Sequence, residues 1–67
     1  MTHFENLIKG LEILQHHGAD SLCAEHDILY CGSPDITEDT LNIEDAEAMD
    51  NARWFWDKSA DSWAFFT

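Results

Sequence analysis

The side chains of this chain that could support binding chemistry are mostly carboxylates. Residues 35–50 carry a dense set of them and no Lys or Arg; the set is Asp35, Glu38, Asp39, Glu44, Asp45, Glu47 and Asp50. Lys and Arg are absent from the whole stretch between Lys9 and Arg53. A folded chain that holds so much charge of one sign repels itself. We therefore expect a partner with basic residues to use this acidic segment.

A row of carboxylates on a rigid frame can imitate nucleic acid. Double-stranded DNA carries one negative charge per roughly 1.7 Å of its axis, and proteins bind these charges with Lys and Arg. Residues 35–50 predict such a row, and Asp20, Glu25 and Asp27 are expected to extend it. Binding of this kind is competitive, fast and sensitive to salt. The competing interpretation is an acidic surface that only keeps the protein soluble.

Cysteine and histidine residues offer two other kinds of chemistry. Cys23 with His26, His16 or His17 has the residue types of a nucleophile and its base, but no motif holds them in a catalytic geometry. We therefore predict that the protein is not an enzyme. Cys23, His26 and Cys31 have the ligand types for zinc, but a strand would direct Cys23 and His26 to opposite faces. We expect no metal, no cofactor and reduced thiols.

Length and composition favour a single small folded domain, residues 1–67. This length is near the lower limit for folding without disulfides or metals. Three Trp, four Phe and one Tyr supply a core that a disordered acidic tail would lack. Fourteen Asp and Glu against three Lys and Arg give a formal charge of -11. Such a surface repels nucleic acid and anionic membranes, so we expect neither as a direct partner.

Two helices are expected to position these side chains. Thr2 and Glu5 have the spacing of a capping box that starts a helix, which ends near His17 and before Gly18. Its apolar face is predicted to consist of Phe4, Leu7, Ile8, Leu11 and Leu14. After an irregular acidic loop, Asn42 is the expected N-cap of a second helix. Its apolar stripe is predicted to be Ile43, Ala46, Met49 and Ala52, with Glu44, Asp45, Glu47 and Asp50 facing outward.

Two hairpins complete the expected fold. Residues 21–32 predict a hairpin that turns at His26 and Asp27 and pairs Leu22 with Cys31 and Ala24 with Leu29. Residues 53–66 predict a second hairpin that turns near residues 58–61 and pairs Trp56 with Trp63 and Trp54 with Phe65. The fold class is therefore α+β, with two helices packed on a four-stranded antiparallel sheet in the order α-β-β-α-β-β.

An aromatic patch is the main rival to the acidic surface. Tyr30, Phe55 and Phe66 are expected on the sheet face opposite the core. Exposed aromatic side chains often supply most of the binding energy at protein interfaces. On this interpretation the protein is a small adaptor that binds its partner through aromatic contacts.

The order of elements resembles small acidic proteins of phages and mobile elements. Arg53-Trp-Phe-Trp-Asp-Lys-Ser-Ala-Asp-Ser-Trp-Ala-Phe65 is similar to their recurring Trp-x-Trp-Asp…Asp-x-Trp tail, and Glu25-His26-Asp27 lies in a similar hairpin. Some of these proteins are anti-CRISPR inhibitors that mimic DNA. The resemblance implies an inhibitor that occupies the DNA-binding surface of a type I CRISPR surveillance complex and blocks target-DNA binding. Separately, we expect a monomer rather than a dimer. Another basic DNA-binding protein is the alternative target.

The expected location is the cytoplasm of a bacterial host cell. The first residues lack the basic start and apolar run of a signal peptide. No apolar stretch reaches the roughly 18 residues of a membrane span.

Overall fold

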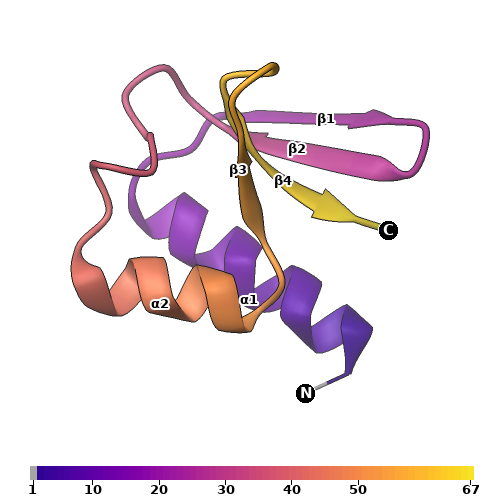
Figure 1. The fold of residues 1–67 in the computed structure, drawn as a ribbon, viewed down its shortest axis with the longest axis horizontal. Coiled ribbons are helices and arrows are strands. Elements are labelled where there is room, and N and C mark those ends of the chain that lie inside the picture. Colours follow the sequence, from indigo (N-terminus) through magenta and orange to yellow (C-terminus); the bar gives the residue numbers. More distant parts are fainter. Residues whose placement is uncertain (1) are drawn as a thin grey trace.

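Two helices lie on one side of a four-stranded antiparallel sheet in the computed structural model, which describes residues 2–67 (Figure 1). The elements are α1 (His3–His16), β1 (Ser21–Glu25), β2 (Ile28–Gly32), α2 (Ile43–Asn51), β3 (Phe55–Asp57) and β4 (Ser62–Phe66). The strand order across the sheet is β1-β2-β4-β3. This architecture confirms the predicted α+β class and the predicted order of elements. Within residues 2–67, neither helix has the length and hydropathy needed to cross a lipid bilayer.

The ends of α1 follow from local hydrogen bonds. Thr2 Oγ1 accepts from the backbone N–H of Glu5 at 3.1 Å, and the Glu5 carboxylate accepts from the N–H of Thr2 at 2.9 Å. These bonds complete the predicted capping box and lower the pKa of Glu5. The helix ends at His16, one residue earlier than predicted, and Gly18 follows with a φ of 94°. Glycine adopts this conformation without strain.

The buried face of α1 differs from the predicted one. Gly10, Ile13 and Leu14 are buried, whereas Phe4 is 68% exposed and Ile8 is 38% exposed. The cause is Trp54, whose indole ring lies where a Cβ at position 10 would be. Its Nε1–H donates to the carbonyl of Asn6 at 3.1 Å. The helix therefore turns its glycine side toward the core, and the N-terminal part of its expected apolar face is left open.

Both hairpins have the predicted registers. Leu22 pairs with Cys31 and Ala24 with Leu29, across a turn at His26 and Asp27. In the second hairpin, Trp56 pairs with Trp63. Trp54 precedes β3, but its ring centroid is 5.2 Å from that of Phe65, and both side chains are almost completely buried. The prediction of an aromatic core from this hairpin is confirmed.

The segment between β2 and α2 contributes to the core, which the sequence pattern did not predict. Ile36 and Leu41 are both buried in this segment. Leu41, just before the N-cap of α2, packs into the core, and Ile43 is 77% exposed. The prediction that Ile43 belongs to the buried stripe of α2 is therefore wrong, whereas Met49 and Ala52 are buried as predicted.

Candidate functional site

The exposed side of α2 carries three carboxylates in a row. Asn42 caps the helix, because its Oδ1 accepts from the backbone N–H of Asp45 at 2.7 Å. Glu44, Glu47 and Asp50 follow at intervals of three residues, and all are exposed. Three residues of an α-helix rise by about 4.5 Å, whereas the phosphates of one DNA strand recur about every 3.4 Å of the helix axis. The α2 row is thus somewhat sparser than a phosphate row.

The loop before α2 presents further carboxylates on an ordered backbone. The exposed members are Asp35, Glu38 and Asp39. The backbone N–H of Thr37 donates to Thr40 Oγ1 at 2.8 Å, and that of Asp39 donates to Thr37 Oγ1 at 3.2 Å. These bonds order the loop internally, and the buried side chains of Ile36 and Leu41 hold it on the body of the domain. Carboxylates on such a backbone lose less conformational entropy when a partner binds.

Asp45 does not face outward as predicted. The Nε2–H of His17, at the end of α1, donates to Asp45 Oδ2 at 2.6 Å. The two side chains are only 24% and 29% exposed. The bond connects the end of α1 to the first turn of α2, so Asp45 holds the helices together and contributes less to the acidic surface than Glu44 or Glu47. Sequence spacing could not reveal this contact, because the two residues are 28 positions apart.

A double-mutant cycle tests this connection. We expect His17→Ala and Asp45→Ala each to lower the free energy of unfolding by about 1 kcal/mol. Each substitution leaves the other side chain half-buried and without its hydrogen-bond partner. Their effects should be coupled by about 0.5–1 kcal/mol, as measured by urea denaturation. Glu44→Ala is the matched control in the same helical turn and should change stability by less than about 0.5 kcal/mol. Additive effects of the two main variants would contradict the contact.

The structure does not bring the predicted hairpin carboxylates next to α2. Glu25 and Asp27 are exposed at the tip of the β1–β2 hairpin, which lies at the opposite end of the molecule from the loop before α2 (Figure 1). Asp20 precedes β1 and is also exposed. The predicted carboxylates therefore divide into a loop–α2 group and a hairpin group.

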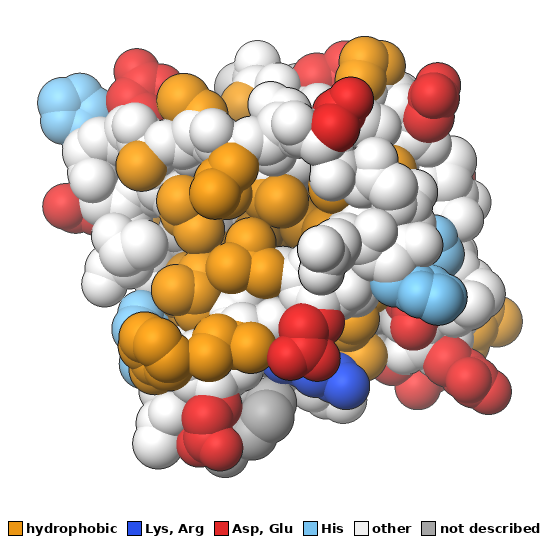
Figure 2. Space-filling view, turned by 180° about the vertical axis from the view of Figure 1, so that it is seen from behind, with side chains coloured by type: hydrophobic (Ala, Val, Ile, Leu, Met, Phe, Trp, Pro, Cys, Tyr) orange, Lys and Arg blue, Asp and Glu red, His pale blue; other side chains and the backbone are white. Residues whose placement is uncertain are grey.

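The negative charge is not neutralised within the described part of the chain. Across residues 2–67, the one contact within 4.0 Å between an acidic and a basic side chain joins His17 to Asp45, so no carboxylate pairs with Lys or Arg. On the face seen in Figure 2, acidic side chains lie around the rim and little basic surface is visible. Unpaired exposed carboxylates create a negative potential that attracts basic surfaces.

An apolar groove crosses the same face, and sequence analysis missed it. Figure 2 shows hydrophobic side chains gathered in its centre. The groove has a volume of about 370 Å³ and separates α1 from the start of the first hairpin. Its apolar lining includes Ile8, Leu11, Leu22 and Cys31. Gly10 could have indicated this groove. A glycine inside an apolar helical pattern often marks close packing on its own side of the helix, so the buried face of α1 is turned toward Gly10 and away from Ile8.

The rival aromatic patch lies on the other sheet face and is partly self-covered. The rings of Phe55 and Phe66 stack with centroids 5.0 Å apart, although Phe66 remains 59% exposed. The hydroxyl of Tyr30 donates to Asp57 Oδ2 at 3.4 Å. Desolvation and the neighbouring Asp57 carboxylate raise the pKa of Tyr30. Phe66 is thus the most exposed ring of the three.

The two cysteines occupy different environments. Cys23 pairs with Tyr30 and is exposed, whereas Cys31 pairs with Leu22 and is buried, so the two thiols lie on opposite faces of the sheet. Burial raises the pKa of the Cys31 thiol. His26 lies at the hairpin turn with a φ of 55°. In residues 2–67, no group of three or more His, Cys, Asp or Glu side chains is arranged to hold a metal ion.

Thiol reactivity should reflect this difference. At pH 8 we expect Cys23 to react with a disulfide reagent at least about 100-fold faster than Cys31, because the thiolate is the nucleophile and Cys31 is shielded. Cys23→Ser should remove the fast phase, and Cys31→Ser the slow phase. In denaturant, the two thiols should react at similar rates. Equal rates in the native protein would contradict the placement of Cys31 in the core.

Comparison with known proteins found no protein-family model, curated protein or solved structure that matches this chain.

Proposed function

We propose that this protein is an inhibitor that mimics nucleic acid and occupies the basic DNA-binding surface of another protein. The proposed contact surface is the loop–α2 group: Asp35, Glu38, Asp39, Glu44, Glu47 and Asp50. The observation that supports it is the combination of a formal charge of -11 with the lack of any Lys or Arg partner for these carboxylates in the described residues. Self-repulsion of this size is relieved when a basic surface binds.

The architecture favours a steric mechanism over a chemical one. Six carboxylates on a docked loop and a capped helix offer acceptor oxygens for Lys and Arg of a partner. A protein that fills a DNA-binding groove excludes DNA without altering either molecule. Association should be fast at low salt and should slow as salt screens the charges.

The target that we propose first is a type I CRISPR surveillance complex. This choice rests on the resemblance of the C-terminal Trp-rich segment and the element order to anti-CRISPR proteins. Other basic DNA-binding proteins would fit the same acidic surface.

The decisive experiment measures target-DNA binding by a purified type I surveillance complex, with and without a stoichiometric amount of this protein. We expect loss of DNA binding when the protein is added first, and recovery of DNA binding as salt is raised over about 50–300 mM. Inhibition that is insensitive to salt would instead favour docking through the exposed Phe66 ring. Unchanged DNA binding would remove this complex as the target, and a pull-down from host lysate on the wild-type protein and on the Glu44→Lys/Glu47→Lys variant would then test other basic targets.

A further inference from the structure

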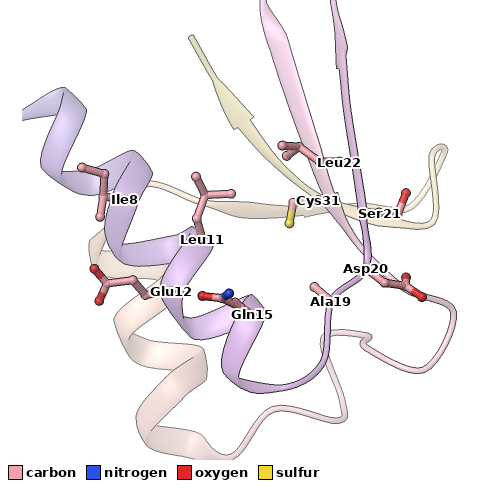
Figure 3. A pocket seen from close by; sticks show the side chains of 9 residues that line it. All are labelled: Ile8, Leu11, Glu12, Gln15, Ala19, Asp20, Ser21, Leu22 and Cys31. Carbon is pink, nitrogen blue, oxygen red and sulfur yellow. The ribbon is translucent and has the colours of Figure 1, made fainter.

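The apolar groove has one wall of helix and one wall of strand. Figure 3 shows Ile8 and Leu11 of α1 on one side, and Leu22 of β1 with Cys31 of β2 on the other. Leu22 is 64% exposed and Ile8 is 38% exposed. Leu22 and Ala24 belong to the sheet face that the helices cover, yet both are exposed, because α1 packs on β2 and an open groove separates it from β1. Contiguous exposed apolar surface of this kind marks interaction sites.

The strand beside the groove has an open backbone edge. β1 is the outermost strand, and all five of its residues are exposed. The N–H of Thr67, which follows β4, donates to the carbonyl of Asp27 at 2.7 Å. The backbone carbonyl of Asp27 therefore points toward β4 and away from β1. Backbone groups of successive residues alternate in direction. The backbone N–H and C=O groups of Ile28 and Tyr30 therefore point toward β1. They form its ladder hydrogen bonds with Glu25 and Cys23.

The same alternation leaves the backbone N–H and C=O groups of Leu22 and Ala24 directed at the open edge. Natural edge strands are protected by Lys, Pro, bulges or a covering element. β1 contains no Lys or Pro, and its five pairs with β2 run without a bulge. This edge is thus able to accept another strand. A strand added there would project alternate side chains toward the same side as Leu22, over the groove.

The charges around the groove select the occupant. Glu12 and Asp20 border it, and Glu25 ends β1. A second copy of this chain would bring another formal charge of -11 to the same place, which electrostatic repulsion opposes. A segment that alternates apolar side chains with Lys or Arg would lay its apolar side chains over the groove and its basic side chains on the opposite sheet face, which Glu25 shares.

We propose that β1 and the α1–β1 groove form a docking site for an extended basic and apolar segment of a partner protein, which adds to the sheet as a fifth strand. Strand addition of this kind takes its affinity from backbone hydrogen bonds and its specificity from alternate side chains. The site does not use the α2 carboxylates, so it stands or falls separately from the proposed inhibition.

The test uses a fluorescein-labelled synthetic peptide in which Lys alternates with Val and Leu, and measures binding to the full chain by fluorescence anisotropy. Two matched peptides are compared: one with Glu in place of Lys, and one with the Lys sequence and N-methylated backbone amides. We expect saturable binding of the Lys peptide, no binding of the Glu peptide, and at least about tenfold weaker binding of the N-methylated peptide. Amide NMR signals of Leu22 and Ala24 should shift with the Lys peptide.

Matched variants separate docking from general charge attraction. Leu22→Lys and Ile43→Lys make the same charge change at exposed apolar positions, but Ile43 is on α2, outside the groove. Leu22→Lys should weaken binding at least about tenfold, and Ile43→Lys less than threefold. Equal effects of the two variants, or equal binding of the N-methylated peptide, would overturn the proposal. A dimer in sedimentation equilibrium that Leu22→Lys abolishes would also overturn it, in favour of a second copy as occupant.

Discussion

The Gly10→Ala variant is expected to lose about 1–2 kcal/mol of unfolding free energy, even though Ala is the better helix former. In an exposed helix interior, replacing Gly by Ala gains up to about 1 kcal/mol. Here the added Cβ would overlap the indole ring of Trp54, and that ring is almost completely buried. Overpacking of a core costs about 1–3 kcal/mol. Since a domain of this size holds only about 3–5 kcal/mol, this loss is a large fraction of the total stability and should lower the urea midpoint clearly.

A second substitution tests whether Trp54 is the residue with which the added Cβ at position 10 clashes. Trp54→Phe removes the indole atoms that a Cβ at position 10 would meet, including Nε1, which donates to Asn6. In the Trp54→Phe background, Gly10→Ala should cost at least about 1 kcal/mol less than in the wild-type chain. Gln15→Ala, at an exposed position of the same helix, is the control and should shift stability by less than about 0.5 kcal/mol. A neutral or stabilising Gly10→Ala, measured by urea denaturation, would refute the packing.

The second large effect is expected from the triple variant Glu44→Lys/Glu47→Lys/Asp50→Lys. Each reversal removes one negative charge and adds one positive charge, so three reversals change the formal charge of -11 by six units, to -5. Asp45 is left unchanged because it bonds His17 and holds the helices together. If the protein mimics DNA, the variant should weaken inhibition of DNA binding at least about 100-fold at low salt, because attraction becomes repulsion along α2. Circular dichroism should show a fold like that of the wild type.

A matched pair of variants tests position against total charge. Glu44→Gln/Glu47→Gln and Ser59→Lys/Ala60→Lys each add two positive units to the formal charge of -11, to give -9. The second pair lies in the exposed turn between β3 and β4. The first pair should weaken inhibition roughly tenfold and the second less than threefold, since close charges contribute most to binding. Equal losses of inhibition would mean that binding depends on the net charge of the protein and that the carboxylates of α2 do not form a specific contact surface.

The candidate site itself was only partly predictable. The exposure of Glu44, Glu47 and Asp50 follows from helical periodicity and from the cap at Asn42, both of which depend on neighbours within four residues. Helical periodicity also predicts that Asp45 faces outward. The structure shows instead that its carboxylate contacts His17, which no pattern within α2 indicates. The groove escaped prediction because its walls come from α1 and β1, and the space between two elements depends on how they pack on the rest of the fold.

By itself, the sequence determined the features that depend on local interactions. The capping box at Thr2, the turn at His26 and Asp27, and the pairing of Trp56 with Trp63 were all readable, because turn length and alternation set a hairpin register. Tertiary structure decided which sides of the helices are buried. Trp54 donates to Asn6, 48 positions away, and its ring turns Gly10 inward and leaves Ile8 at the surface. Such a choice rests on the fit of side chains that meet only after the chain has folded, so no periodicity within one element contains it.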